Sequence, residues 1–187
     1  TCRAQDRESV SHALERIREV ARQKKTEKFT SLMHHVTTDL LGTAFFKLKR
    51  DAAPGVDGLT WKAYEVGLEA RLRDLHSQVH DGAYRALPSR RRYIPKADGR
   101  QRPLAVAALE DKIVQRAVTM VLNAIYEADF LGFSYGFRPK RSQHDALDAL
   151  AYGLGKRRIN WVLDADIRSF FDTISHTWLI RSIEHRI

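Results

Sequence analysis

The chain has 187 residues, enough to bury one sizeable hydrophobic core or two small cores in contact. With 43% hydrophobic and 29% charged residues the composition excludes a disordered chain, and no apolar run approaches the roughly 20 residues of a bilayer span. Lys and Arg number 32 against 23 Asp and Glu, and a formal net charge of +9 indicates a polyanionic partner or a basic patch at a membrane surface.

The cysteine count indicates the redox compartment of the protein, and the two ends of the sequence indicate whether it is part of a longer chain. The single cysteine, Cys2, can form no internal disulfide, and no signal peptide opens the chain, which fits a reducing cytoplasm. The sequence begins at Thr1 rather than Met and ends at Ile187 inside an expected helix. We therefore expect a piece of a longer protein.

The first part of the chain predicts three helices. Apolar residues recur on one face of a helix from about residue 6 to residue 24. After a polar stretch, a second helix fits residues 38–50 and ends before Gly55. Thr60 can cap a third helix that runs to Gly82, with apolar residues three and four apart.

The middle of the chain predicts a hairpin followed by a helix. Residues 93–96 and 103–106 have the pattern of short strands, and the Asp98-Gly99 dipeptide between them is a strong signal for a hairpin turn. The next stretch, residues 109–127, repeats apolar residues at helical spacing.

The last part adds two helices and a strand. Ser142 followed by Asp145 resembles a capping box at the start of a helix, and Ser175 can start the final helix. Residues 161–166 predict a buried strand that ends at an aspartate. Together the elements predict an α+β chain that is mostly helical.

Basic residues concentrate in one stretch. Residues 85–102 hold seven Lys and Arg against one acid, Asp98, with Tyr93 among them. Smaller basic clusters lie within residues 138–141 and 156–158. A solvated basic face is the alternative interpretation, but basic clusters beside turns and aromatic residues favour contact with nucleic-acid phosphates.

Three aspartates lie within or shortly after the predicted strand. Side chains alternate along a strand, so Asp164 and Asp166 point the same way, and hard oxygen ligands on one face suit Mg²⁺. In the alternative interpretation Asp166 caps the following turn and Asp172 makes a local turn bond. The aspartates by themselves leave both interpretations open.

The run WVLDADIRSFFDTISH, which starts at Trp161, resembles the first catalytic motif of reverse transcriptases. That motif is a strand, an aspartate and an aromatic residue five positions later, and Asp166 and Phe171 have this spacing. The form FFD followed by Ile174 and His176 is characteristic of the group II intron class.

This resemblance implies roles for individual residues. It implies that Asp166 is catalytic and binds both Mg²⁺ ions, with help from the backbone carbonyl of Ile167. It also implies that Phe171 lies under the sugar of the incoming nucleotide and excludes a 2′-hydroxyl by size. Asp164 matches an acidic position that varies within the family, so Asp164 and Asp172 are supporting residues.

The run RRYIPKADGRQRPL, from Arg91, resembles the fingertip hairpin that folds over the incoming nucleotide in the same family. The resemblance implies that Lys96 and Arg102 bind the triphosphate and that Arg91 and Arg92 touch the template backbone. Without it, two cations around an Asp-Gly turn would more simply be a soluble turn.

Two further blocks resemble the family. SYGFRPKRS, from Ser134, matches a turn beside the nucleotide pocket, where Arg138 and Arg141 face phosphate or carboxylate partners; a solvated loop before a capped helix is the alternative. APGVDGLTWKAY, from Ala53, resembles the first finger motif, in which Asp57 would bond the backbone of a tight turn.

The resemblance implies an architecture of right-hand polymerase fingers and an incomplete palm, largely helical with a β-hairpin fingertip and a short palm sheet. Residues 1–36 would form the N-terminal extension helix and a template-side loop, and residues 37–106 the fingers. Residues 107–187 would form the junction and the first part of the palm, ending after the first catalytic Asp motif.

The resulting hypothesis is an Mg²⁺-dependent RNA-directed DNA polymerase of a group II intron in the bacterial cytoplasm. Its expected partners are an RNA template with a DNA primer, dNTP and the intron RNA, with no membrane and with a possible homodimer through exposed apolar surface. No Tyr-x-Asp-Asp follows Asp172, so we predict that the chain alone is inactive. The alternatives are a non-catalytic maturase that binds intron RNA, and a retron or CRISPR-associated reverse transcriptase.

Overall fold

The chain divides into two compact units, one of residues 1–20 and 31–124 and the other of residues 21–30 and 125–187. In the computed structural model the described residues are 2–95, 97, 99–157 and 159–187, with side chains described from residue 8 onward. The predicted domain boundaries after residues 36 and 106 stay a prediction.

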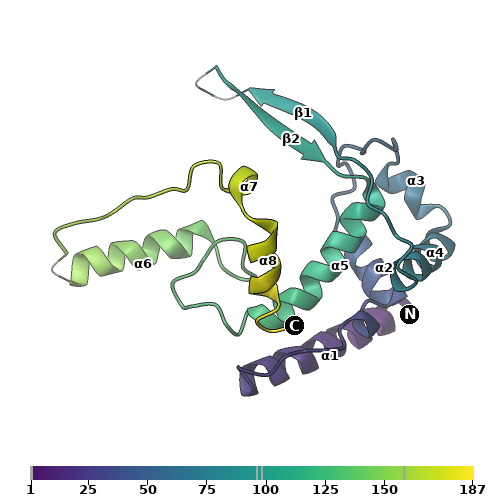
Figure 1. Ribbon diagram of the computed structural model, residues 1–187, viewed down its shortest axis with the longest axis horizontal. Coiled ribbons are helices and arrows are strands. Elements are labelled where there is room, and N and C mark those ends of the chain that lie inside the picture. The colour runs from purple at the N-terminus through teal and green to yellow at the C-terminus, as the bar shows by residue number, and fades with distance from the viewer. Residues whose placement is uncertain (1, 96, 98, 158) are drawn as a thin grey trace. The chain divides into compact units, whose positions relative to one another are not determined.

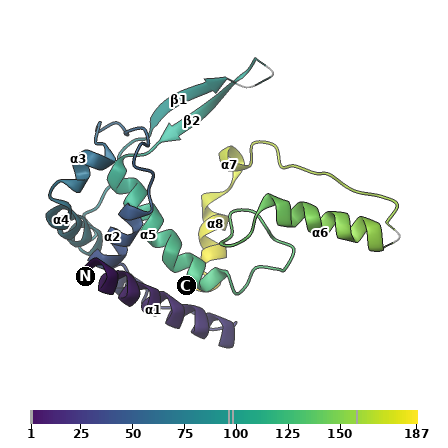
Figure 2. The ribbon, with the colours of Figure 1, turned by 180° about the vertical axis from the view of Figure 1, so that it is seen from behind.

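The first unit combines helices with one β-hairpin (Figures 1 and 2). Its elements are α1 (Cys2–Gln23), η1 (Met33–His35), α2 (Thr38–Phe46), α3 (Trp61–Glu65), α4 (Leu68–His80), β1 (Arg90–Pro95), β2 (Gln101–Val106) and α5 (Leu109–Tyr126). The last residues of α1 and of α5 belong to the second unit. The predicted first helix is confirmed, and Val10, Leu14 and Ile17 on its apolar face are buried.

An aromatic cluster lies within the core of the first unit. Phe45 of α2 stacks on Trp61 of α3, with ring centroids 4.5 Å apart and planes within 12°. The indole Nε1 of Trp61 donates to the carbonyl of Phe45 at 3.2 Å. Tyr64 is also fully buried, and its hydroxyl donates to Glu110 at 3.0 Å, which joins α3 to the first turn of α5.

The helices of the first unit differ from the prediction in their ends. The single helix predicted from Thr60 to Gly82 is wrong, because Val66 is extended and Gly67 has a φ of 73°. Neither conformation continues an α-helix, so the segment forms α3 and α4 instead. The helix predicted over residues 38–50 ends at Phe46.

The turn before α3 has the bond predicted for it. Oδ1 of Asp57 accepts the backbone N–H of Leu59 at 3.2 Å, and Gly58 has a φ of 68°. Thr60 then caps α3 by accepting the N–H of Ala63 at 3.3 Å. Asp57 is therefore a structural residue of this turn.

The second unit contains the end of α5, then α6 (Gln143–Lys156), α7 (Phe170–Thr173) and α8 (His176–Ile183). The predicted capping box is confirmed: Ser142 Oγ accepts the N–H of Asp145 at 3.2 Å, and the Asp145 carboxylate accepts the N–H of Ser142 at 2.7 Å. These bonds from Ser142 lower the pKa of the Asp145 carboxyl below its ordinary value.

The buried strand predicted over residues 161–166 is wrong. This segment has no regular secondary structure, and the side chains of Trp161 and Leu163 are 91% and 89% exposed. A strand satisfies its backbone groups and buries its apolar side chains against a neighbouring strand. The described residues provide no such neighbour, and the sheet that they form is the β1–β2 hairpin, so the predicted short palm sheet is wrong as well.

The largely helical character and the β-hairpin of the predicted fold class are confirmed, and the assignment to polymerase fingers and an incomplete palm stays a prediction. The described elements are mostly helical and include a two-stranded antiparallel hairpin. In the part of the chain that the structure describes, no helix is long and apolar enough to cross a bilayer.

Candidate nucleic-acid interface and carboxylate motif

The arginines of the β-hairpin lie on both of its faces. β1 and β2 pair antiparallel, with Arg92 opposite Leu104 and Ile94 opposite Arg102. Residues that face each other across paired strands point the same way, and neighbours along one strand point to opposite faces. Arg92 and Arg102 therefore share a face, and Arg90 joins them because it precedes Arg92 by two residues.

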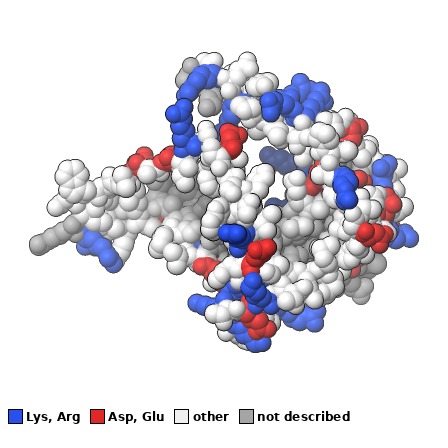
Figure 3. All heavy atoms as spheres, in the orientation of Figure 1, with Lys and Arg blue, Asp and Glu red and all other residues white. Residues whose placement is uncertain are grey.

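The opposite face carries a different set of side chains. Arg91 and Tyr93 lie there, so Arg91 and Arg92, which the sequence assigned to the same template backbone, point to opposite sides of the hairpin. All residues of β1 are exposed, and the blue spheres along the hairpin in Figure 3 are arginine side chains. Both faces are thus accessible to a ligand.

The turn of the hairpin is described in part. Lys96, predicted to bind a triphosphate together with Arg102, lies outside the described residues, as does Asp98. Gly99 has a φ of 80°, the left-handed conformation that a tight hairpin turn takes at glycine.

A buried aspartate holds the segment that enters β1. Asp111, in the first turn of α5, is 4% exposed and accepts hydrogen bonds from the Tyr84 hydroxyl and from the backbone N–H of Leu87, the latter at 3.2 Å. Burial, followed by the bond to Asp111, raises the pKa of Tyr84 well above its ordinary value. The segment before β1 is therefore hydrogen-bonded to α5 through the carboxylate of Asp111.

The segment that leaves β2 is fixed by a close backbone approach. A Cβ atom on Gly55 would lie 2.6 Å from the Cα of Ala108 and 2.9 Å from the carbonyl oxygen of Ala107. Only glycine fits at this distance. The Lys112 ammonium also donates to the carbonyl of Ala53 at 2.9 Å, so α5 holds the 53–55 segment as well.

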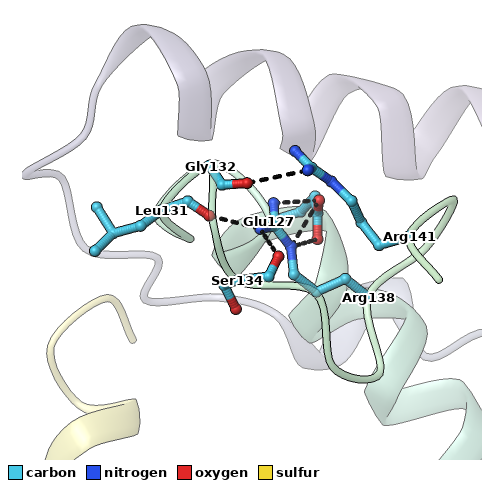
Figure 4. Close-up of polar contacts among 6 residues, drawn as sticks. All are labelled: Glu127, Leu131, Gly132, Ser134, Arg138 and Arg141. Atoms are coloured by element: carbon cyan, nitrogen blue, oxygen red, sulfur yellow. Dashed lines mark hydrogen bonds and ion pairs between the residues drawn. The ribbon is translucent and has the colours of Figure 1, made fainter. Parts of the chain in front are cut away.

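Arg138 has a carboxylate partner within the second unit (Figure 4). Its guanidinium Nη2 donates to Glu127 at 2.7 Å, and Nη1 donates to the carbonyls of Leu131 and Ser134 at 2.8 and 2.7 Å. The residue is 8% exposed. Of the two partners that the sequence left open for Arg138, the geometry favours the carboxylate over a phosphate.

Arg141 lies in the same loop but is exposed. Its Nη1 donates to the carbonyl of Gly132 at 3.0 Å, and the guanidinium lies 5.3 Å from the ring centroid of Tyr135. An exposed arginine that lies over a half-buried aromatic ring keeps donors toward solvent, which suits a phosphate contact.

The carboxylate motif lies in an exposed segment of the second unit. Asp164, Asp166 and Asp172 are all exposed, and the side chains of Ile167 and Phe171 are 67% and 85% exposed. Asp172 sits in the first turn of α7, where its N–H donates to the carbonyl of Ser169 at 2.9 Å.

The residues present supply part of what a Mg²⁺ site needs. Asp164 and Asp166 offer the hard carboxylate oxygens that Mg²⁺ prefers. Among the described residues, however, no group of three or more His, Cys, Asp or Glu side chains comes together in a way that could hold a metal ion. The donor chemistry of these aspartates fits Mg²⁺, and the described residues by themselves bring together fewer than three such side chains.

Three residues, Arg90, Asp111 and Gly55, have positions or contacts that the sequence did not predict for them. Arg90 could have been found from strand alternation, because it is two residues before Arg92. The supporting roles of Asp111 and Gly55 have no local signal, since both depend on residues more than 20 positions away.

Comparison with known proteins places the chain in a family. The family model described as "Reverse transcriptase (RNA-dependent DNA polymerase)" matches residues 94–187, half of the chain. The chain belongs to the reverse transcriptase family. The matched region of this reverse transcriptase chain contains β2 with Arg102, the Arg138 loop and the Asp166 motif.

Curated relatives extend the similarity toward the N-terminus. This reverse transcriptase chain is 43% identical over 137 residues to Protein YkfC of Escherichia coli strain K12, which covers 72% of the chain and 36% of that protein. It is 33% identical over 176 residues to the group II intron-encoded protein LtrA of Lactococcus lactis subsp. cremoris, which covers 93% of the chain and 29% of LtrA. The predicted relationship to group II intron-encoded reverse transcriptases is thus confirmed, and the chain spans about a third of the length of these relatives.

Proposed function

We propose that this chain forms the nucleic-acid-binding fingers and the first catalytic motif of an RNA-directed DNA polymerase of the group II intron type. One observation carries the proposal: the hairpin presents Arg90, Arg92 and Arg102 on a single exposed face. Exposed arginines along one face of a ribbon match a phosphate backbone in charge and hydrogen-bonding geometry.

Other residues receive roles in the same proposal. Arg102 and Lys96 bind the triphosphate of the incoming dNTP, and Phe171 selects the sugar by size. Arg91, Arg138 and Arg141 remain candidates for contacts with template or primer, with Arg138 the weakest because its donors are engaged by Glu127 and two carbonyls.

Asp166 and the carbonyl of Ile167 would hold Mg²⁺, supported by Asp164 and Asp172, with the other donors supplied from outside residues 1–187. When bound, Mg²⁺ ions stabilise the charge that develops during phosphoryl transfer. The Asp166 carboxylate contributes a hard oxygen and negative charge, so in a polymerase that contains this chain we expect Asp166→Asn to abolish DNA synthesis. Full synthesis by that variant would contradict the role of Asp166.

The hairpin face gives the decisive test of binding. The 187-residue chain is titrated into a fluorescein-labelled RNA annealed to a DNA primer, and binding is followed by anisotropy over a range of salt concentrations. Arg92→Ala and Arg102→Ala each lower the affinity several-fold and reduce the salt slope by about 0.7 to 0.9 for each phosphate that is no longer neutralised. Arg73→Ala removes the same charge from an exposed position on α4 and leaves both quantities close to wild type.

Equal effects of all three variants would mean that the chain binds through its net charge rather than through the hairpin, and the proposal would be wrong.

We also propose that the natural setting is the bacterial cytoplasm. The proposed partners are the intron RNA and a second copy of the chain, which would dock on the exposed apolar side chains of the second unit.

A maturase that binds intron RNA without polymerising is the second candidate. It is favoured by the location of the arginine face, which is formed entirely in the first unit, whereas Asp164 and Asp166 lie in the second. A splicing assay with the Asp166→Asn variant of the intact protein separates the two functions. Splicing that persists while DNA synthesis is lost would show that both reside in one protein, and a wild-type protein that splices without synthesis would show a maturase.

A further inference from the structure

Arg186 is a completely buried arginine just after α8. Its Nη1 donates to the carbonyl of Lys25 at 2.7 Å and to the carboxylate of Asp129 at 2.6 Å. Its Nη2 donates to the carbonyls of Ala21 and Lys24, each at 3.3 Å. One side chain therefore contacts three carbonyls near the end of α1 and one acid beyond α5.

The backbone of Arg186 binds the same segment. Its carbonyl accepts the N–H of Phe29 at 2.8 Å, and its guanidinium lies 5.8 Å from the Phe29 ring centroid. The last carbonyls of a helix have no partner within the helix, and a cation placed there satisfies them and complements the helix dipole. Asp129 balances the buried charge, so the segment 21–30 is held at both ends by one residue.

The segment 21–30 carries exposed positive charge. Four of its side chains are exposed cations: Arg22, Lys24, Lys25 and Lys28. Of these, Lys24 also pairs with Glu27 at 2.7 Å. A flexible chain loses conformational entropy when several cations engage one polyanion, whereas a segment that is already fixed loses less.

We propose that Arg186 is a positioning residue, which fixes the segment 21–30 so that its exposed cations act together on the phosphates of a bound RNA. The proposal rests on the nucleic-acid binding proposed above and adds a second basic surface to it. Arg186 itself contacts no RNA and acts through the segment.

The test is a variant cycle measured by anisotropy with fluorescein-labelled single-stranded RNA and the 187-residue chain. Arg186→Gln lowers the affinity about five- to tenfold and reduces the salt slope by about 0.7 for each phosphate that the segment no longer neutralises. The double variant Lys25→Ala/Lys28→Ala lowers the affinity by a similar factor. In that background Arg186→Gln has a smaller effect than in the wild-type chain, because two of the four cations that it positions are already gone.

Two further variants separate positioning from folding and from charge. Arg181→Gln removes the same charge from an exposed position on α8 and leaves affinity and salt slope near wild type. Arg186→Lys keeps a positive charge beside Asp129 and the fold, but a single ammonium cannot reach all four acceptors, so its affinity lies between wild type and Arg186→Gln. If Arg186→Gln does not fold, the comparison of Arg186→Lys with wild type decides the test.

The outcomes are distinct. Equal losses of affinity from the Arg186 substitution in the wild-type and Lys25/Lys28-substituted backgrounds would overturn the proposal, and so would an Arg186→Lys variant with wild-type affinity and salt slope. A wild-type chain that binds no RNA would overturn the proposed function and the positioning role together.

Discussion

Burial separates two uses of arginine in this chain. Arg138 and Arg186 are buried and donate to carbonyls and to one carboxylate each, so they stabilise the second unit. Arg92 and Arg102 are exposed on the hairpin and keep their charge at the surface. A planar guanidinium is suited to both settings, because it can satisfy several carbonyls inside a protein and can make the phosphate contacts proposed for the exposed arginines.

Arg138 should contribute strongly to stability. Its side chain is 5% exposed, and Arg138→Ala leaves Glu127 and the carbonyls of Leu131 and Ser134 without their donor. We expect the free energy of unfolding to fall by about 3 kcal/mol, the cost of removing one partner of a buried ion pair. Urea unfolding followed by circular dichroism measures the change.

Arg141 provides the matched control, because it lies in the same loop but is exposed. Arg141→Ala should change the free energy of unfolding by no more than about 0.5 kcal/mol. If both variants lose the same stability, the Glu127 pair does not hold this loop.

Tyr84 should make the first unit sensitive to alkaline pH. Its folded pKa is raised, chiefly by burial and then by its hydrogen bond to Asp111. The folded state therefore holds the proton more tightly than the unfolded state, whose tyrosines titrate near pH 10. The stability that this difference provides is complete below about pH 10 and is lost as the pH rises above it.

Urea unfolding at pH 8 and pH 10.5 tests this dependence. We expect Tyr84→Phe to be less stable than wild type at pH 8 by about 1 kcal/mol, because the bond to Asp111 is gone, yet to lose less stability between the two pH values. Tyr93→Phe, on the exposed hairpin, should keep the wild-type difference. A Tyr84→Phe variant with the same alkaline loss as wild type would contradict the linkage.

At the scale of elements, the sequence predicted what a segment prefers but not whether a partner is present. The hairpin was predictable because both strands and the turn lie within residues 90–106. The segment 161–166 begins with the apolar residues Trp161, Val162 and Leu163, as a buried strand would, yet it has no regular secondary structure and is exposed. A strand forms when a neighbour accepts its hydrogen bonds, and that neighbour is a property of the surrounding chain rather than of the segment.

Gly55 links two elements through its missing side chain. A Cβ there would meet the backbone of Ala108 at 2.6 Å, a contact that flexible side chains cannot relieve. We expect Gly55→Ala to lower the free energy of unfolding by about 1–3 kcal/mol, since one of two backbone segments must move. Gly132→Ala, where the added atom meets nothing within 4 Å, should be near neutral.

Because residue 108 leads from β2 into α5, Gly55→Ala should also disturb the base of the hairpin. Amide hydrogen exchange should accelerate in residues 101–106 of this variant and remain unchanged there in Gly132→Ala. Unchanged exchange together with wild-type stability would show that the backbone accommodates the methyl group, and that Gly55 does not set the position of β2.

At the scale of the whole molecule, the location of the positive charge was predictable from the sequence, whereas hydrogen bonds between distant residues were not. The basic run at residues 85–102 was visible in the sequence and forms the exposed hairpin. The bond from Arg186 to Ala21 joins residues 165 positions apart, and no local pattern marks either partner. Likewise the three aspartates of the carboxylate motif could be recognised by their spacing, but their spacing does not say which other ligands come near.

The carboxylate motif leads to a prediction about DNA synthesis by the 187-residue chain alone. Two-metal phosphoryl transfer needs a cage of several oxygen ligands, and the described residues bring no three acidic or histidine ligands together. We expect the chain to bind a labelled RNA–DNA primer–template and to add no nucleotide in the presence of Mg²⁺ and dNTP, as resolved on a denaturing gel.

A viral reverse transcriptase in a parallel reaction confirms that the substrate is competent. Asp166→Asn distinguishes a contaminating polymerase from the chain itself, because extension that persists in this variant is not due to Asp166. Extension by the wild-type chain that disappears in Asp166→Asn would show that the chain assembles a working metal site, and the prediction of an inactive chain would be wrong.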